Sequence, residues 1–533
     1  MRDLKKLRSM LTAGQIGRRD FMMGALAMGV SVAAASTMAE KALAATPNKG
    51  GTFRQGLTGA GSGDSLDPAQ ILDSYMINVS FGQLRNCLTE IDQQNKLVGE
   101  LAESWDASDD ASIWTFKLRK GVEFHNGKTL DSTDVVESIQ HHLGEDSRSA
   151  AKGIIANITD VKADGKETVV FTLSGGSADF PYLLSDYHLS ICPAKPEGGM
   201  DWESGVGTGG YVLKSFDPGV RTITTRNPNY WKTGYGHFEE IDTIFIADVA
   251  ARTAALQTGE IDGMQNVDLK TVKLLERQPN VIVFHSTGNQ HITLPMFTDT
   301  APFDNNDLRL ALKYSIDREE WLRVILKNYG ELGNDIPIGP VNQYRATPEE
   351  IPQRAYDPDK AKHHLKKAGY DSIDLQLYAA NTAFEGAVDA VILYAERARP
   401  AGINITVQRE PDDGYWSNIW MNKPWVCSYW GGRPTEDWMF SQVYSTGADW
   451  NETHFDNERF MKLLVEGRAE LDDAKRRDIY VEMQRIVHDE GGAVIPLFMS
   501  YVSAVNDKVQ LPEQMASNWG FDGEKAAERW WYK

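Results

Sequence analysis

The sequence predicts a mixed α/β protein with more than one lobe. A chain of 533 residues is too long for one ordinary hydrophobic core, and 41% hydrophobic and 24% charged residues are typical of a soluble globular protein. Segments with strand and helix patterns alternate irregularly, without an internal repeat. Tethered domains are usually separated by Pro/Gly/Ser-rich linkers, and the sequence has none. Lobes connected by strands therefore fit the sequence better than domains on a tether.

The first half of the chain is predicted to alternate between short strands and single helices. Period-two hydrophobic patterns bounded by turn residues indicate the strands, and apolar residues at helical spacing after N-cap residues indicate the helices. The expected strands are 50–57, two within 101–130 joined by an Asp-rich turn, a hairpin over 158–173, 211–216, 220–231 and 241–247. The expected helices are 74–88, 131–143 and 249–262.

The second half is predicted to be richer in helices. The expected helices are 305–330, 357–370, 387–402 and 458–491, and the expected strands are 374–380 and 404–410.

The first 44 residues are predicted to form an export signal. A basic start precedes the pair Arg18 and Arg19, and a mildly apolar run over 24–39 leads to a small-residue pattern ending at Ala44. Paired arginines before such a run are typical of a twin-arginine signal. The alternative is a membrane anchor, but the run is short and rich in Gly, Ser and Thr. We therefore expect twin-arginine export of a folded protein to the periplasm, with cleavage near Ala44.

The charge balance argues against some classes of partner. Without residues 1–44 the chain has 48 basic and 72 acidic side chains, a formal charge of −24. Nucleic acids and anionic membranes bind clustered cations, so neither is expected as a partner. A small ligand responds to local groups, so the net charge says little about it. The three cysteines, Cys87, Cys192 and Cys427, allow at most one disulfide bridge.

No motif in the sequence supplies catalytic chemistry. Gly205, Gly207 and Gly210 match G-x-G-x-x-G, but a strand follows where phosphate binding needs a helix, so a tight bend is expected. The pairs His141–His142 and His363–His364 are adjacent on predicted helices, where neighbouring side chains point about 100° apart and chelate poorly. The sequence contains no recognisable nucleophile–base set and no metal motif. We therefore expect neither an enzyme nor a cofactor.

Six blocks in order along the mature chain carry a resemblance to a known family. They are "LAESWDASDDASIWTFKLRKGVEFHNGKTLDSTDVVESI", "GTGGYVLKSFDPGVRTITTRNPNYW", "RTAALQTGEIDG", "APFDNNDLRLALKYSIDREEW", "YDPDKAKHHLKKAGY" and "GGAVIPLFMSYVSAV". Through these blocks the chain resembles the extracellular solute-binding proteins of family 5, the peptide, nickel and opine receptors of ABC importers. The resemblance covers essentially the whole mature chain.

The resemblance implies a two-lobed periplasmic binding protein fold of type II, similar to cluster C, with a hinge and a central ligand cleft. Lobe I would comprise 45–290, with an inserted subdomain around 96–205, and a C-terminal return over 498–533. Lobe II would comprise 291–497. Chain crossings near 285–303 and 493–505 would form the hinge. A ligand would shift the lobes toward a closed form, which would dock on a membrane permease.

The segment 411–450 is predicted to supply ligand contacts. It holds six of the fourteen tryptophans, of which Trp420 and Trp425 are expected in the core. Trp416 and Trp430 correspond to positions where the family's peptide receptors present tryptophans to ligand, and Tyr415 is assigned to the same site. A flat indole covers a ligand face with little loss of rotamer freedom.

The loop of Gly431, Gly432 and Arg433 departs from the family. Dipeptide and oligopeptide receptors carry an aspartate there, which holds the α-ammonium of the peptide. Arg433 would instead offer a bidentate fork to a carboxylate or phosphate. Glu436 or Asp437 could restore an amine contact or could neutralise Arg433, and the loop could also be a surface bend. We assign both glycines, Arg433 and Asp437 to the ligand site.

The expected function is that of a monomeric periplasmic binding protein of an ABC importer. Its solute would be a peptide or a peptide-like compound, with anionic, opine-like and sugar-containing ligands favoured over a generic peptide. A receptor for a nickel chelate or haem is the alternative within the family. A secreted hydrolase is an alternative from another class, and it would require a catalytic set that the sequence does not show.

Overall fold

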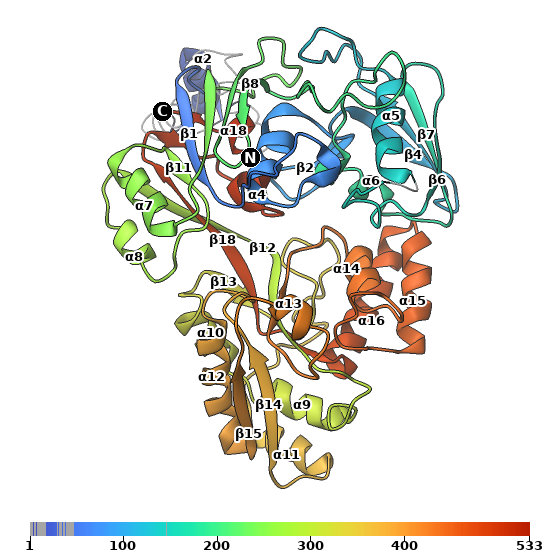
Figure 1. Cartoon of the computed structure of the whole chain (residues 1–533), viewed down its shortest axis with the longest axis vertical. Coiled ribbons are helices and arrows are strands. Elements are labelled where there is room, and N and C mark those ends of the chain that lie inside the picture. The colour runs from blue at the N-terminus through green and yellow to red at the C-terminus, as the bar shows by residue number, and fades with distance from the viewer. Residues whose placement is uncertain are drawn as a thin grey trace.

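The computed structural model describes residues 47–144 and 147–533, together with 18–28 and five single positions before residue 47. Figure 1 shows two lobes, an upper one in blue to green that also receives the red C-terminal segment, and a lower one in yellow to orange. We call residues 47–290 and 498–533 lobe I and residues 291–497 lobe II, after the predicted boundaries. The predicted cleavage near Ala44 falls outside the described residues. No described helix has the length and apolar character needed to cross a membrane.

A ten-stranded sheet extends through both lobes. Its order is β16-β12-β18-β11-β1-β10-β9-β8, and β13 and β17 pair beside β18 and β12. β1 is parallel to β10 and β11, and the other pairs are antiparallel. The strands are β1 (Thr52–Leu57), β8 (Tyr211–Asp217), β9 (Arg221–Arg226), β10 (Glu240–Phe245), β11 (Gly263–Met264), β12 (Val281–Pro295), β13 (Gly330–Leu332), β16 (Ser428–Trp430), β17 (Ala493–Val494) and β18 (Leu497–Asn506).

Two strands of this sheet, β12 and β18, carry the chain from one lobe to the other (Figure 1). Val281 pairs with Asn506 at the lobe I end, and His291 pairs with Phe498 at the lobe II end. The register shifts between Thr287 and His291, so the ladder is interrupted midway. Both strands overlap the segments 285–303 and 493–505, where the chain crossings were predicted.

Lobe I contains a second, antiparallel sheet in the order β4-β5-β7-β6, with α5 packed against β6 and β7. Its Asp-rich turn and its hairpin confirm the predicted pairs of strands. Asp131 caps α5 in a capping box with Asp134. The elements are β4 (Ala102–Ala107), β5 (Ile113–Leu118), α5 (Ser132–Leu143), β6 (Ile158–Ala163) and β7 (Thr168–Leu173).

The remaining elements of lobe I are short. They are α4 (Ser74–Val79), a π-helical turn (Ser80–Leu84), β2 (Thr89–Ile91), β3 (Leu97–Gly99), α6 (Phe180–Leu183), α7 (Val249–Thr258), α8 (Val272–Leu275), α17 (Gly520–Gly523), α18 (Ala526–Arg529), and the pair β19 (Val509–Gln510) and β20 (Trp531–Tyr532). The predicted glycine bend is confirmed, because a Cβ at Gly207 would lie 2.1 Å from the carbonyl oxygen of Leu84 and strand β8 follows.

Lobe II is built from the helices α9 to α16 and a parallel pair of strands, β14 and β15. The predicted helix 305–330 is divided into two because Asp317 caps a new helix, and Asp472 divides 458–491 in the same way. The elements are α9 (Asn306–Tyr314), α10 (Arg318–Val324), α11 (Pro358–Lys367), β14 (Ile373–Ala379), α12 (Ala387–Ala398), β15 (Ile403–Arg409), α13 (Tyr415–Asn418), α14 (Glu436–Val443), α15 (Glu458–Ala469) and α16 (Asp473–Glu490).

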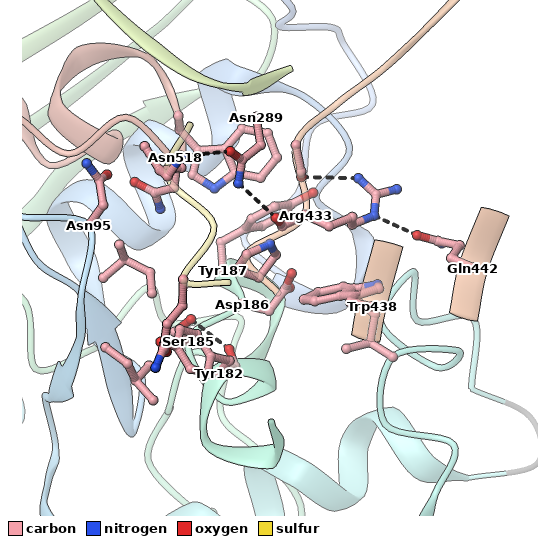
Figure 2. A pocket seen from close by; sticks show the side chains of 18 of the residues that line it. Asn95, Tyr182, Ser185, Asp186, Tyr187, Asn289, Arg433, Trp438, Gln442 and Asn518 are labelled. Atoms are coloured by element: carbon pink, nitrogen blue, oxygen red, sulfur yellow. Dashed lines mark hydrogen bonds between the residues drawn. The ribbon is translucent and has the colours of Figure 1, made fainter. Parts of the chain in front are cut away.

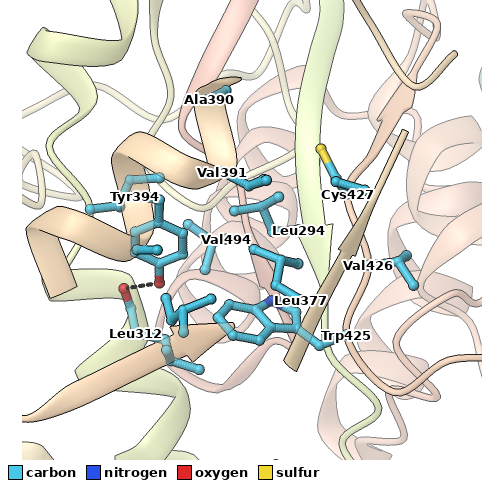
Figure 3. Close-up of a cluster of buried hydrophobic side chains, with 14 of the residues drawn as sticks. Leu294, Leu312, Leu377, Ala390, Val391, Tyr394, Trp425, Val426, Cys427 and Val494 are labelled. Atoms are coloured by element: carbon cyan, nitrogen blue, oxygen red, sulfur yellow. Dashed lines mark hydrogen bonds between the residues drawn. The ribbon is translucent and has the colours of Figure 1, made fainter. Parts of the chain in front are cut away.

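The main core of lobe II lies between β12, β14 and α12 (Figure 3). Trp425 is fully buried there, as predicted, and it packs against the ring of Tyr394. The Tyr394 hydroxyl donates to the carbonyl oxygen of Leu312 at 2.8 Å. Cys427 is buried in the same core, and all three cysteines are free thiols.

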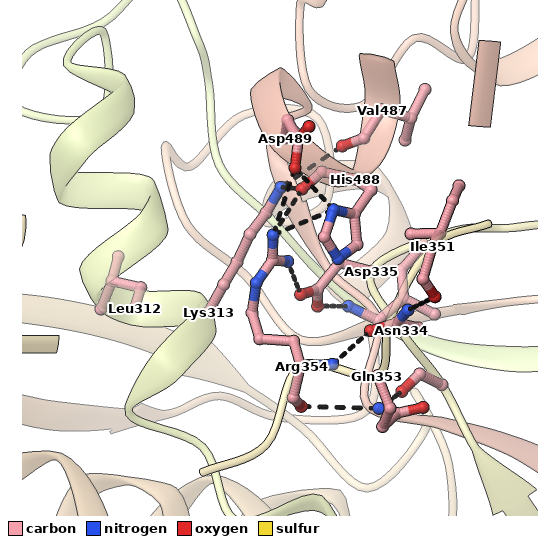
Figure 4. Close-up of polar contacts among 12 residues, drawn as sticks. Leu312, Lys313, Asn334, Asp335, Ile351, Gln353, Arg354, Val487, His488 and Asp489 are labelled. Carbon is pink, nitrogen blue, oxygen red and sulfur yellow. Dashed lines mark hydrogen bonds and ion pairs between the residues drawn. The ribbon is translucent and has the colours of Figure 1, made fainter. Parts of the chain in front are cut away.

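A buried carboxylate, Asp335, connects three further segments of lobe II (Figure 4). It forms ion pairs with Arg318 at 2.7 Å and with Arg354, and it accepts a hydrogen bond from the amide of Ile495 at 3.0 Å. Burial alone would raise its pKa, but the charges of Arg318 and Arg354 hold the pKa of Asp335 below its usual value. The contact fixes the position of the chain just before β18 enters lobe I.

Candidate functional site

A cavity of about 850 Å³ lies between the two lobes. Lobe I lines it with residues of 72–97, 150–188 and 518–519, and lobe II lines it with residues of 340–343 and 432–450. Six side-chain amides face it, together with five large aromatic side chains. The amides are Gln94, Asn95, Asn289, Gln343, Gln442 and Asn518, and the aromatic residues are Tyr182, Tyr187, Trp438, Trp450 and Trp519. This size and mixture of groups are typical of a small-molecule site.

Arg433, which the sequence analysis assigned to the ligand site, lines the cavity. Its Nε donates to Gln442 Oε1 at 2.6 Å (Figure 2), and its Nη1 donates to the carbonyl oxygen of Gly431 at 3.1 Å. The guanidinium lies 5.6 Å from the ring centre of Trp430 and 6.0 Å from that of Trp438. In the described part of the chain, no acid lies within ion-pair distance of it. Burial lowers the pKa of Arg433, and the charge of Asp186 opposes this effect.

The backbone of the predicted loop is fixed to the chain crossing. The carbonyl oxygen of Arg433 accepts hydrogen bonds from Asn289 Nδ2 at 3.0 Å and Asn342 Nδ2 at 3.1 Å. Gly432 lines the cavity and lies directly against Asn289, whereas Gly431 is not among the lining residues. Arg433 is therefore presented by a fixed loop and not by a free surface bend.

Trp430 lies behind the cavity wall. It is only 6% exposed, and its Nε1 donates to Glu452 Oε1 at 2.9 Å. The Nε1 of Trp420 donates to the other oxygen of the same carboxylate at 2.7 Å. The rings of Trp430 and Trp450 are in contact, with centres 5.7 Å apart, and Trp450 lines the cavity. Trp430 thus supports Arg433 and Trp450 from behind, and the structure does not place it among the cavity-lining residues.

Tyr415 and Trp416 are also outside the cavity lining. Tyr415 is fully buried, and its hydroxyl donates to the carbonyl oxygen of Cys427 at 2.7 Å. Trp416 is 38% exposed and packs edge-on against Tyr415 and Tyr429. These contacts give Tyr415 a structural role and leave Trp416 on a different surface of lobe II.

The two acids that follow the loop have other partners than Arg433. Asp437 forms an ion pair with Arg468 Nε at 3.2 Å, and Glu436 accepts a hydrogen bond from the amide of Tyr344 at 2.7 Å. Burial raises the pKa of Asp437 to about 6 and that of Glu436 to about 7. Neither acid lines the cavity. In this structure they therefore neither neutralise Arg433 nor offer a carboxylate to a ligand.

Several lining residues were not assigned from the sequence. Trp438 and Trp450 belong to the tryptophan-rich segment, whose composition was the available signal. Tyr187 begins a short 3-10 turn of lobe I and Asp186 is its N-cap residue, and this turn has no distinctive motif. Within the described residues, no group of three or more His, Cys, Asp or Glu side chains is placed to hold a metal ion.

The family model that matches this chain is that of the bacterial extracellular solute-binding proteins, family 5 Middle, and the match covers residues 96–452. The chain belongs to this family. Members of family 5 bind small ligands or peptides and work with an ABC permease, and their names are those of binding proteins and not of enzymes.

Three members illustrate the similarity. The chain is 26% identical to "Heme-binding protein A" of Haemophilus influenzae over 80% of this chain and 83% of the relative. It is 25% identical to the "Glutathione-binding protein GsiB" of Escherichia coli O6:K15:H31 over 87% and 92% of the two chains. The solved structure of AgaA from A. tumefaciens R10 in complex with agropinic acid has a TM-score of 0.72 at 22% identity, covering 91% of this chain and 99% of that one. The family 5 fold of two lobes is therefore shared.

Proposed function

We propose that this protein is the substrate-binding component of an ABC importer and that it captures a peptide or peptide-like solute carrying an anionic group. Membership of family 5 and the cavity between the lobes support the receptor class. The proposed lobes are 45–290 with 498–533, and 291–497, with β12 and β18 as the hinge. Relatives named for glutathione binding and for a complex with agropinic acid are consistent with a peptide-like or opine-like solute.

The single observation that carries the ligand proposal is the charge of Arg433. A half-buried guanidinium at a cavity wall, without an acid within ion-pair distance in the described chain, is an unsatisfied charge. Its Nη2 has no hydrogen-bond partner among the described residues. A carboxylate or phosphate of the ligand would supply the missing partner with charge-assisted hydrogen bonds.

The proposal is tested by identifying the solute and then removing the cation. Ligand released from gently purified protein is identified by mass spectrometry, and its affinity for wild type and Arg433→Ala is measured by calorimetry. Losing a charged hydrogen bond should weaken binding about tenfold to a hundredfold. Arg345→Ala is the control, because Arg345 pairs with Glu331 away from the cavity lining. Unchanged affinity of an anionic ligand for Arg433→Ala would refute the role of Arg433.

The remaining parts of the proposal concern the setting of the protein. We propose that it is exported to the periplasm by the twin-arginine route, acts as a monomer, and performs no chemistry on its ligand. Nucleic acid is not a proposed partner. Release of nickel or haem from the purified protein, detected by metal analysis, would instead favour the alternative receptor of the same family.

A further inference from the structure

Asp186 faces the same cavity as Arg433, from the opposite lobe (Figure 2). Asp186 precedes the 3-10 turn Tyr187–Leu189 and belongs to lobe I, whereas Arg433 belongs to lobe II. Among the described residues that line the cavity, Asp186 is the only one with a carboxylate. The two side chains are near enough for the charge of Asp186 to raise the pKa of Arg433, but they do not form an ion pair within 4 Å.

One oxygen of the Asp186 carboxylate is already occupied. Oδ1 accepts a hydrogen bond from the amide of His188 at 3.0 Å and lies 2.6 Å from His188 Nδ1. His188 Nε2 lies 2.8 Å from the carbonyl oxygen of Ile71, and both this oxygen and the Asp186 carboxylate can only accept, so both ring nitrogens donate and His188 forms an ion pair with Asp186. Oδ2 has no hydrogen-bond partner in the part of the chain that the structure describes. His188 therefore holds the carboxylate in place and leaves one oxygen available.

The other acids near the cavity are not available for a ligand. Asp437 is paired with Arg468, and Glu436 is buried against the amide of Tyr344. Lys96, which also lines the cavity, is exposed at its rim and adds a second cation. A ligand that enters this site therefore meets the cations Arg433 and Lys96 and the free oxygen of the Asp186 carboxylate, whose other oxygen is paired with His188. Asp186 and Arg433 are on different lobes.

We propose that the ligand carries a cationic amine as well as an anionic group, and that Asp186 on lobe I binds the amine while Arg433 on lobe II binds the anion. This inference rests on the proposed function. It narrows the proposed ligand of the protein to compounds that carry both a cationic amine and an anionic group. Such a ligand satisfies both charged side chains at once, so it bridges the lobes and stabilises their closed arrangement.

The rest of the cavity indicates what lies between the two charges. The side-chain amides that line it can donate and accept hydrogen bonds, so they suit the amide or hydroxyl groups of a ligand. Leu72, Ile91, Ala150 and Ile154 give the lobe I wall an apolar part. The chemical class is thus a short peptide or an amino-acid conjugate with free amine and acid groups and at least one apolar substituent.

The test uses the exported protein and four forms of one probe. These are the tripeptide Ala-Leu-Ala, its N-acetylated form, its C-amidated form and the doubly blocked form, compared with succinate, spermidine and maltotriose as anionic, cationic and neutral probes. Thermal shift and calorimetry are measured for wild type, Asp186→Asn and Arg433→Gln. The asparagine of the Asp186→Asn variant keeps an oxygen that can accept the hydrogen bond from the His188 amide, but it has no negative charge. Glu167→Gln is the control for loss of a carboxylate on lobe I, because Glu167 is 58% exposed in a surface pair with Lys120 and does not line the cavity.

The free tripeptide should bind wild type most tightly, and N-acetylation should weaken it about tenfold to a hundredfold. N-acetylation should have little further effect in Asp186→Asn, and amidation should have little further effect in Arg433→Gln. Glu167→Gln should behave as wild type. Equal losses on N-acetylation in wild type and Asp186→Asn would overturn the role of Asp186. A preference for succinate or maltotriose would overturn the proposal that the ligand carries both charges, but not the proposal that the protein is a solute receptor. Binding of none of the probes would count against both proposals.

Discussion

Asp179 of lobe I and Arg476 of lobe II form a buried ion pair with an N···O distance of 2.6 Å. Each side chain is only 7% exposed. Arg476 is held ready for this contact, since its Nε donates to the carbonyl oxygen of Gly467 at 3.1 Å and its guanidinium lies 5.3 Å from the ring centre of Tyr480. The amide of Ala178, next to Asp179 in the chain, donates to the carbonyl oxygen of Arg468 at 2.8 Å. The structure therefore shows the lobes in contact through paired groups from each of them.

Asp179→Asn is predicted to weaken ligand binding by favouring an open arrangement of the lobes. Removing one charge from a buried pair leaves the other without its partner unless the lobes separate and water reaches it. If closure accompanies binding, the lost contact should raise the Kd about tenfold for every ligand form alike. Calorimetry gives the Kd, and small-angle scattering of the ligand-free variant should show a larger radius of gyration.

The control for this prediction is Glu350→Gln. Glu350 forms an ion pair with Arg477 at 2.7 Å, and Arg477 follows Arg476 on α16. In contrast to Asp179 and Arg476, Glu350 and Arg477 both belong to lobe II. This substitution should change neither the Kd nor the radius of gyration. An Asp179→Asn protein with wild-type dimensions and affinity would show that the cross-lobe pair does not contribute to closure.

Gly432→Ala is predicted to disturb the loop that presents Arg433. A Cβ at Gly432 would lie 2.7 Å from Asn289 Cβ and 3.1 Å from the backbone of Asn289, so one of the two segments must move. Overpacking of this kind costs about 1–3 kcal/mol, and the moved loop would no longer hold the guanidinium at the cavity wall. We expect a lower melting temperature and an affinity loss of about tenfold, which thermal denaturation and calorimetry would measure.

The neighbouring Gly431→Ala is the matched control. Its Cβ would meet no atom closer than Arg433 Nη1 at 3.7 Å, an ordinary contact distance. Stability and affinity should stay near those of wild type. Equal losses of stability and affinity in Gly431→Ala and Gly432→Ala would contradict the prediction that the close approach of Gly432 to Asn289 positions the loop.

Glu452→Gln is predicted to change the pH dependence of stability. Burial raises the pKa of Glu452 to about 7 from the ordinary 4.5, although hydrogen bonds from Trp420 and Trp430 oppose this effect. The folded protein therefore keeps this proton between about pH 4.5 and 7, where the unfolded chain has lost it. The contribution of Glu452 to the free energy of unfolding therefore decreases as pH rises through that interval, by roughly 3 kcal/mol in total.

The glutamine side chain of the Glu452→Gln variant does not titrate, so the stability of wild type relative to this variant should fall as pH rises from about 4.5 to 7. Urea denaturation at about pH 5 and about pH 8 measures this difference. Glu167→Gln serves as a control, because Glu167 is 58% exposed in a surface pair with Lys120 and its replacement should have only a small effect on stability. A constant difference between wild type and Glu452→Gln over this pH range would disprove the shifted titration.

The alternation of hydrophobic residues was enough to predict most strands and the mixed α/β class, because period two and period 3.6 are local properties of the chain. The sequence did not predict that two long helical segments would each divide into two helices, because a single aspartate determines each division. Asp317 and Asp472 each cap a new helix inside a segment that is helical in pattern throughout. The division of the chain between the lobes stays a prediction from the family resemblance.

The candidate site was predictable only in part, because strand orientation and tertiary contacts decided the rest. On β16, Ser428 and Trp430 point to the buried face and Tyr429 points outward, and no local pattern of this three-residue strand indicates which face is which. Trp430 was therefore placed at the ligand, although its indole faces the core. Asp186 reaches the cavity only because the two lobes come together, and its short turn carries no sequence signal.

A conservative change of both arginines, Arg18→Lys with Arg19→Lys, is predicted to block export. The two residues begin α2 (Arg18–Ala27), and an export receptor would read the pair itself, so retaining the positive charge should not rescue it. Cell fractionation should find the variant as a full-length precursor inside the cell, whereas exported wild type should begin after Ala44 by mass spectrometry of its N-terminus. Arg8→Lys leaves the pair intact and should export normally. Equal export of the double variant would indicate another route, and an exported chain that still contained residues 24–39 would support the membrane-anchor interpretation.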